Sequence, residues 1–384
     1  MRLHNVSIVL FDRVIACGSI EIEGGVIADI QETGGQASHT VYPGFIDMHG
    51  DMIELELEPR AGVDFPMEVA VKHLDARLAA SGVTTAYAGV SFSRTAKDGA
   101  RRSFEHTSQI IKALKENIVD LRVDHRIHAR FDVTYADAID ALGGLLDVKA
   151  IDLVSLMDHT PGQGQYRNVE KLVANRISGG LSEKEARAYV EKRMTHAVPA
   201  EQILKNLERV SQLCSDRAVA IASHDDDTVA KANLMADVGA TISEFPVTLE
   251  AAKTAADRGL MIAMGAPNAM RGKSYSGNLS AREAHAKGLL HILAADYHPA
   301  AIMPAIQQLA RSDPDGLPGA VRLASTNPAR ALGLEDRGKI EVSKRADLAV
   351  FDANQRAVAT IRGGNMIHND GSFPLAEDAI RAAA

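Results

Sequence analysis

The sequence predicts a parallel (β/α)₈ barrel of the TIM type, with a small β-sandwich domain built from both ends of the chain. Between about residues 42 and 330, eight short apolar segments alternate with amphipathic segments, the pattern of parallel strands with crossover helices. Outside that region, apolar and polar residues alternate with period two around glycine turns, which indicates paired strands. A doubly wound open sheet, which has the same alternation of strands and helices, is the alternative architecture.

The two ends of the chain have matching strand patterns. Residues 19–30 alternate around Gly24 and Gly25, and similar stretches follow at 338–342, 346–352 and 357–361. Two terminal segments with the same pattern can complete one sheet between them, with the long middle inserted. We therefore assign residues 1–41 and 331–384 to the small domain and residues 42–330 to the barrel.

The middle of the chain supplies the eight barrel strands. We place them at 42–48, 83–90, 123–132, 151–158, 218–223, 240–245, 260–265 and 289–295, with helices at 67–80, 107–117 and 228–238 among the connections. Thr228 follows three aspartates, a good helix start. The segment 160–215 is longer than a usual connection. Its charged pattern at 181–190 predicts extra helices outside the barrel, with a lid over the site as the alternative.

Composition limits the function classes. The chain has 384 residues, 46% hydrophobic and 24% charged, with a formal net charge of −8, which argues against nucleic acid or an anionic membrane as the main partner. Its two cysteines, Cys17 and Cys214, are too few for a disulfide framework or a thiolate metal site. No apolar run reaches the roughly 20 residues of a membrane span and no signal pattern opens the chain, so we expect a cytoplasmic protein.

Histidines and carboxylates recur where the expected strands end. In a barrel the active site lies at the carboxyl ends of the strands, and His49 and Asp51, two residues apart on a strand, point to the same face. Such residues recur on five of eight strands, including Asp132, His159, His224 and Asp296. A lone histidine is more often a loop anchor, and Asp225–Asp227 more often a helix N-terminal cluster. The recurrence instead favours a metal centre of the Zn²⁺, Mn²⁺ or Fe²⁺ type.

These residues resemble the amidohydrolase superfamily of metal-dependent hydrolases. The likeness lies in residues 43–49, the eight-strand pattern, Asp296 after the last strand, and residues 338–340 with 344–350. Within the superfamily, residues 153–165, 222–226, 264–268 and 271–281 are similar to the PhnM group. That group comprises ribose 1-methylphosphonate 5-triphosphate diphosphatases of phosphonate metabolism.

The resemblance implies a set of site residues. It assigns metal binding to His49, Asp51, His159, His224 and Asp296. Asp132 would be a carboxylate that bridges two divalent ions per chain. Zinc is the expected metal, with manganese or iron as the alternatives. Asp296 is also the implied catalytic residue, which shuttles a proton. Three departures matter: the first motif is His-x-Asp where most members have His-x-His, no lysine on the fourth strand offers a carbamylated bridge, and His298 is an added histidine. His298 has no role in the pattern.

The resemblance also implies the reaction. A metal-bridging hydroxide would attack a phosphoanhydride of a ribose 1-phosphonate 5-triphosphate-like substrate and release the 5-phosphate and pyrophosphate. Hydrolysis of an amide or cyclic amide is the alternative, and a non-catalytic binding protein is the third possibility. We expect a small anionic substrate and no nucleic acid or membrane; a homo-oligomer and contacts with other phosphonate-pathway enzymes stay open.

A polar loop is the candidate site for the phosphates and the ribose. Its cations, hydroxyls and backbone N–H groups suit a polyphosphate, although a solvated turn would use the same residue types. Arg60 and Arg130 are weaker candidates, equally suited to structural ion pairs. The full predicted set is Arg271, Lys273, Ser274, Ser276, Asn278, Arg130 and Arg60.

Overall fold

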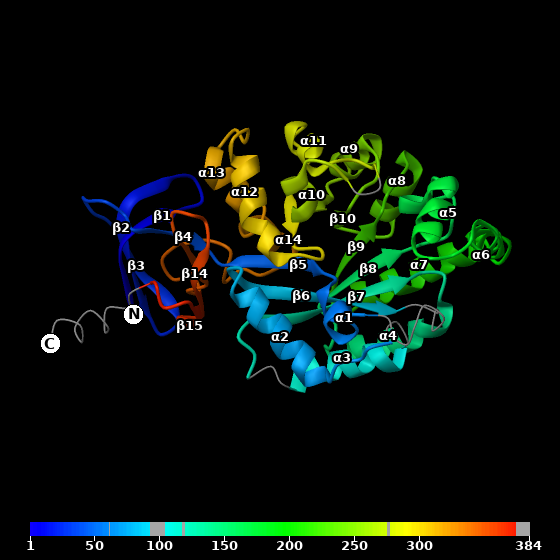
Figure 1. The fold of residues 1–384 in the computed structure, drawn as a ribbon, viewed down its shortest axis with the longest axis horizontal. Helices are drawn as coiled ribbons and strands as arrows, with labels where there is room; N and C mark the ends of the chain where they lie inside the picture. The colour runs from blue at the N-terminus through cyan, green and yellow to red at the C-terminus, as the bar shows by residue number, and fades with distance from the viewer. Residues whose placement is uncertain (61, 93–103, 117–119, 275–276, 374–384) are drawn as a thin grey trace.

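Eight parallel strands form the barrel that the sequence predicts. The computed structural model describes residues 1–60, 62–92, 104–116, 120–274 and 277–373. The strands pair in chain order and cross the centre of the molecule in Figure 1. They are β5 (Phe45–Gly50), β6 (Val83–Phe92), β7 (Asp124–Asp132), β8 (Leu153–Met157), β9 (Ala220–His224), β10 (Ile242–Glu244), β11 (Met261–Gly265) and β12 (Ile292–Ala294).

The first and last strands join just beyond their carboxyl ends. The backbone N–H of Asp51 donates to the carbonyl of Asp296, and the N–H of Asp296 donates to the carbonyl of His49, both at 2.9 Å. Inside the barrel, the Asp47 carboxylate accepts from the N–H of Ala295 at 2.8 Å. Three residues expected in the site therefore lie at the closing seam of the barrel.

Helices cover the outside of the barrel and bury one apolar face each. The predicted helices are present as α2 (Met67–Ala79), α3 (Phe104–Glu116) and α8 (Val229–Asp237), and the Thr228 side chain caps α8 by accepting from the N–H of Lys231. The expected end of the second at residue 117 lies outside the described residues. The others are α1 (Met52–Leu57), α4 (Ile139–Asp147), α9 (Leu249–Asp257), α10 (Ala266–Arg271), α11 (Ala281–Ala286), α12 (Ile302–Ala310), α13 (Gly316–Arg322) and α14 (Thr326–Ala331).

The long connection after β8 contains the extra helices that the sequence predicts. A short turn, η4 (Gly164–Tyr166), leads into α5 (Val169–Ser178) and α6 (Glu183–Thr195), which lie at one end of the molecule in Figure 1. These two helices pack on each other around a small core of Leu172, Val173, Ala186 and Val190. The next helix, α7 (Ala200–Ser215), packs against α4 and β9 as an ordinary barrel helix.

Both chain termini build a separate, mainly antiparallel sheet, beside the barrel in Figure 1. Its strand order is β15-β14-β13-β4-β1-β2-β3, and Val26 bridges Arg345, so part of the sheet curls around a core of its own. The members are β1 (Arg2–Val9), β2 (Val14–Glu23), β3 (Val26–Glu32), β4 (His39–Pro43), β13 (Leu348–Phe351), β14 (Ala357–Arg362) and β15 (Asn365–Asn369). This arrangement confirms the predicted fold class, whereas the exact boundaries at 41 and 331 stay a prediction.

One expected strand is divided between the two sheets. The sequence places a single barrel strand at 42–48, but β4 carries Tyr42 and Pro43 in the small sheet and β5 begins at Phe45. Gly44 lies between them. In the described ranges, no helix combines the length and the apolar character needed to cross a membrane.

Candidate metal centre and substrate cavity

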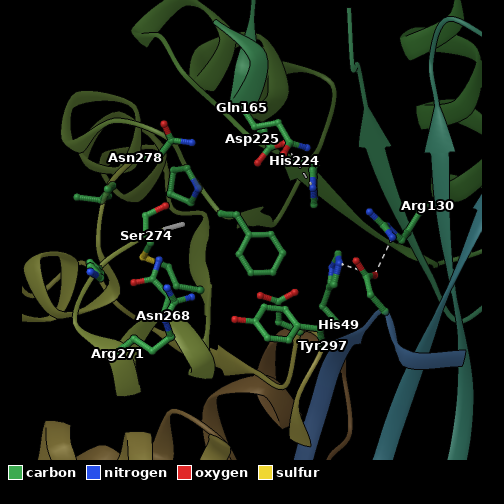
Figure 2. A pocket seen from close by; sticks show the side chains of 17 residues that line it. His49, Arg130, Gln165, His224, Asp225, Asn268, Arg271, Ser274, Asn278 and Tyr297 are labelled. Atoms are coloured by element: carbon green, nitrogen blue, oxygen red, sulfur yellow. Dashed lines mark hydrogen bonds and ion pairs between the residues drawn. The ribbon is translucent and has the colours of Figure 1, made fainter. Parts of the chain in front are cut away.

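A cavity of about 400 Å³ opens at the carboxyl ends of the barrel strands. Imidazoles and carboxylates form one wall, and polar side chains from the segment after β11 form the opposite wall (Figure 2). The lining residues are His49, Asp51, Arg130, Gln165, His224, Asp225, Phe245, Pro246, Met264, Asn268, Arg271, Lys273, Ser274, Asn278, Leu279, Asp296 and Tyr297.

Glu244, at the end of β10, is not one of the residues that line the cavity, but it lies among three histidines. Its side chain has no exposed surface. One oxygen, Oε1, lies 3.1 Å from His49 Nδ1 and 3.6 Å from His128 Nε2, and the other, Oε2, lies 3.1 Å from His224 Nδ1. Neither Glu244 nor His128 is among the site residues that the sequence predicts.

The charges of this cluster are strongly coupled. Burial alone would raise the pKa of Glu244, but the surrounding histidines hold it well below its usual range. Burial opposes protonation of His49, yet Glu244 and Asp51 together raise its pKa to about 10. Burial lowers the pKa of His128 to about 3. The ionised form of the buried Glu244 carboxylate thus depends on positive charge next to it.

Several buried atoms of the cluster have no hydrogen-bond partner among the described residues. They include Asp225 Oδ2, and also His49 Nδ1 and Glu244 Oε1, which lie 3.1 Å from each other as an ion pair. Buried polar atoms are nearly always paired, so the carboxylate oxygens among them fit a bound cation. Two sets of side chains bring ligand atoms within 4.8 Å of one another: His49, His224 and Glu244; and His159, His224 and Asp225. Imidazole and carboxylate donors at this spacing fit a divalent cation of the zinc, manganese or iron type.

The backbone is strained at three positions in this wall. Asp225, Phe245 and Asp296 follow β9, β10 and β12 and have φ angles of 54°, 52° and 58°. Side chains other than glycine seldom adopt this left-handed conformation, and such strain concentrates at functional sites. Holding these three side chains in the cavity wall therefore reduces the stability of the fold.

Asp51 and Asp296 differ in their electrostatics. Burial would raise the pKa of Asp51, but Arg130 and His49 lower it far below its ordinary value, and the Arg130 guanidinium donates to it at 2.7 Å. Among the described residues no cation forms an ion pair with Asp296, and burial together with the charge of Asp51 raises its pKa to about 6. Two nearby carboxylates with separated pKa values can serve different roles.

The opposite wall carries unpaired positive charge. Arg271, Lys273, Ser274 and Asn278 all line the cavity there, as the sequence predicts for an anion-binding loop. Within the described part of the chain, neither Arg271 nor Lys273 forms an ion pair. Ser276, also predicted, lies outside the described residues.

Other predicted residues lie apart from the cavity lining. Asp132 accepts hydrogen bonds from the backbone N–H and the hydroxyl of Thr134 and belongs to neither ligand set, so its position gives no support to a bridging role. Arg60 is exposed and bridges Val63. His159 lies beside His224, with ring centroids 6.3 Å apart. His298 is exposed.

Comparison with known proteins places this geometry in a family. A model described as "Amidohydrolase family" matches residues 316–367. The chain is 36% identical over 363 residues to the alpha-D-ribose 1-methylphosphonate 5-triphosphate diphosphatase of Escherichia coli strain K12, covering 91% of this chain and 94% of that protein.

Solved structures share the fold at low sequence identity. An N-acetyl-D-glucosamine-6-phosphate deacetylase from Mycobacterium smegmatis superposes with a TM-score of 0.63 at 15% identity, over 96% of this chain and 99% of the other. A triazine hydrolase variant gives 0.64 at 14%, over 100% and 98%. The chain is a hydrolase of the amidohydrolase superfamily and belongs to its PhnM family.

Proposed function

We propose that this protein hydrolyses a phosphoanhydride bond of a ribose 1-phosphonate 5-triphosphate-like substrate and releases the 5-phosphate and pyrophosphate. The observation that carries the proposal is the two-walled cavity. Two cations without ion-pair partners among the described residues, Arg271 and Lys273, face the histidine and carboxylate wall across a space of about 400 Å³. Such cations suit the terminal phosphates of a polyphosphate, and the identity to the Escherichia coli diphosphatase supports the same substrate class.

The residues fit a metal-dependent reaction. His49, His224 and Glu244 would hold a divalent cation, with His159 and Asp225 next to them. When bound, such a cation lowers the pKa of water and polarises a phosphoryl oxygen. Arg271 and Lys273 would neutralise phosphate charge and hold the chain of phosphates in line for attack. Two ions per chain stay a prediction.

Asp296 is the proposed proton carrier. It lines the cavity next to His49 and Asp51, and burial raises its pKa to about 6. A carboxyl group that titrates near neutral pH is suited to accept a proton from the attacking water and to return it to the leaving pyrophosphate. No other reactant is needed for this hydrolysis, because water supplies both the hydroxyl group and the proton.

The test is a product assay with purified protein loaded with Zn²⁺, Mn²⁺ or Fe²⁺. We expect ribose 1-methylphosphonate 5-triphosphate to yield pyrophosphate and the 5-phosphate, observed by ³¹P NMR, and we expect Asp296→Asn to slow the reaction at least 100-fold. Amides and cyclic amides are assayed as substrates in parallel. Cleavage of those compounds while the triphosphate stays intact would overturn the proposal in favour of an amidase.

A further inference from the structure

The segment between β8 and α7 packs as a unit of its own outside the barrel, at one end of the molecule in Figure 1. Helices α5 and α6 bury a small core between them, and Tyr166, Val169 and Tyr189 pack against that core. We call residues 164–195, from η4 to the end of α6, the outer hairpin. Its contacts with the barrel connect it to the metal centre.

The first contact comes from Arg193, in the last turn of α6. Its half-buried guanidinium donates through Nη2 to the backbone carbonyl of His159 at 2.8 Å, 34 residues back along the chain. Hydrogen bonds from a charged donor are shorter and stronger than those between neutral groups. Arg193 therefore fixes the backbone that carries the His159 ring.

The second contact is made to the ring itself. The imidazole of His159 has His224 on the metal wall as one neighbour, with ring centroids 6.3 Å apart, and Tyr166 of the outer hairpin as another, at 6.0 Å. His159, His224 and Asp225 bring ligand atoms within 4.8 Å of one another. The outer hairpin thus contacts both the backbone and the ring of one member of this ligand set.

The start of the outer hairpin is also attached to the loop that carries the other two members. Gln165 lines the cavity beside His224 and Asp225 (Figure 2). The N–H of Gly164 donates to the Asp227 carboxylate at 2.8 Å. A Cβ atom on Gly164 would lie 3.3 Å from the Cβ and the carbonyl oxygen of Asp225. The turn η4 therefore packs tightly against the loop after β9.

We propose that the outer hairpin is a brace for His159 and that Arg193 is its main positioning residue. Arg193 holds the backbone of His159, and Tyr166 holds the ring, so that the imidazole stays beside His224 and Asp225. The inference rests on the proposed function, because it takes His159 as a metal ligand. It places a determinant of metal affinity outside the cavity lining, on a helix at the exterior of the barrel.

Metal affinity tests the brace without reference to activity. Zn²⁺ binding is measured by competition with a chromophoric chelator, and His159→Ala identifies the binding step that uses this ligand. For that step we expect Arg193→Met to weaken the affinity about 10- to 100-fold, as the loss of an outer partner of a metal ligand does. Arg193→Lys keeps the charge and a donor for the carbonyl, so it should recover most of the affinity.

The matched control is Arg187→Met on the same helix. Arg187 forms ion pairs with Glu170 on α5 and with Glu183, so its removal loosens the surface of the outer hairpin and leaves the bond to His159 in place. We expect wild-type Zn²⁺ affinity for this variant. An equal loss of affinity in Arg187→Met and Arg193→Met would mean that only the general stability of the outer hairpin matters, and would overturn the positioning role of Arg193.

The coupling has to act in the reverse direction as well, because a coupling free energy between two sites is reciprocal. Zn²⁺ should slow amide hydrogen exchange in the last turn of α6 in the wild-type protein, compared with chelator-treated protein. In Arg193→Met this effect of Zn²⁺ should be absent. Exchange in α6 that does not respond to Zn²⁺ in the wild-type protein would contradict the brace.

The outcomes separate this inference from the proposed function. Wild-type affinity in both Arg193→Met and Tyr166→Leu, or wild-type metal binding in His159→Ala, would overturn the brace, while pyrophosphate release from the triphosphate would still support the hydrolase. A wild-type protein that binds no Zn²⁺, Mn²⁺ or Fe²⁺ would overturn both. If Arg193→Met does not fold, Tyr166→Leu decides by the same affinity measurement, with a loss expected.

Discussion

Glu244 carries its charge in the interior of the molecule, where an ionised carboxylate is expensive unless cations and donors surround it. Three imidazoles lie within 3.6 Å of its two oxygens. Each of those rings is itself buried and limited in its partners. A protonated His49 or a bound cation can supply the positive charge that the Glu244 carboxylate needs.

A second buried carboxylate allows a test of stability. Asp75 accepts hydrogen bonds from the N–H groups of Val123 and Arg122 and lies 3.0 Å from His125 Nε2. Burial opposes its ionisation, but these partners lower its pKa below the ordinary value. Its stabilising effect is thus present above the unfolded-state pKa of about 3.9 and is lost as the pH falls through the lower folded-state pKa.

We expect Asp75→Asn to lower the free energy of unfolding by about 1–3 kcal/mol at pH 7, with a smaller difference from wild type below about pH 4. Urea unfolding across this pH range measures both quantities. The matched control is Asp237→Asn, which removes an exposed ion pair with Arg258 and should change stability by less than about 1 kcal/mol. A difference that stays constant with pH would contradict the assignment.

The two cations of the cavity give the prediction for substrate binding. Arg271→Met and Lys273→Met should each raise KM for the triphosphate about tenfold or more, since a charge-assisted hydrogen bond contributes about 1.5–3 kcal/mol, and metal content should not change. Steady-state kinetics and metal analysis give the two results. Arg258→Met, which removes an arginine away from the cavity, is the control; equal KM values for all three would refute the phosphate assignment.

The predicted site residues include two of the histidines beside Glu244, His49 and His224, but neither Glu244 nor His128. His49, His224 and Asp296 follow apolar strands, and the barrel rule brings such positions together. Glu244 also ends a predicted strand, at 240–245, but a single glutamate before Phe245 and Pro246 resembles an ordinary strand end. Its position along the strand would have identified it, because Glu244 pairs in register with His224 on the neighbouring strand.

At the scale of the element, the positions of the strands can be predicted more readily than the side-chain contacts between them. All eight barrel strands are found within a few residues of their predicted positions because apolar runs flanked by turns leave little choice. The contact between Asp51 and Arg130 could not be predicted from the sequence. It depends on β5, β6 and β7 lying side by side and on the absence of a side chain at Gly89. Such contacts arise from register rather than from local pattern.

Helix α6 offers a local test of how the outer hairpin is held. Ser182 and Glu185 form a reciprocal cap at its start, with the Glu185 carboxylate 2.9 Å from the N–H of Ser182. We expect Ser182→Ala to weaken the first turn by about 1 kcal/mol, seen as faster amide hydrogen exchange in α6. Thr195→Ala at the other end of the same helix is the control. Unchanged exchange at the first turn would mean that packing on α5 alone holds the helix.

At the scale of the whole molecule, Gly44 joins the two sheets. Its N–H donates to the carbonyl of Asp347 in the terminal segment at 2.8 Å, and a Cβ atom there would lie within 3.0 Å of three atoms of the buried Thr84 side chain. We expect Gly44→Ala to destabilise the protein by about 1–3 kcal/mol through overpacking, measured by thermal unfolding. Gly34→Ala, where an added Cβ meets nothing, should match wild type, and equal stability of both variants would contradict this account.

The closing seam of the barrel also affects the order in which the chain can fold during synthesis. His49 and Asp51 leave the ribosome early, but the backbone bonds that fix them come from Asp296, about 250 residues later in the sequence. β4 likewise waits for β13 before its open edge is paired. A nascent chain can thus fold its middle helices as they emerge, yet the backbone at His49 and Asp51 is not fixed until Asp296 has been made. Metal uptake should therefore follow the closure of the barrel rather than guide its beginning.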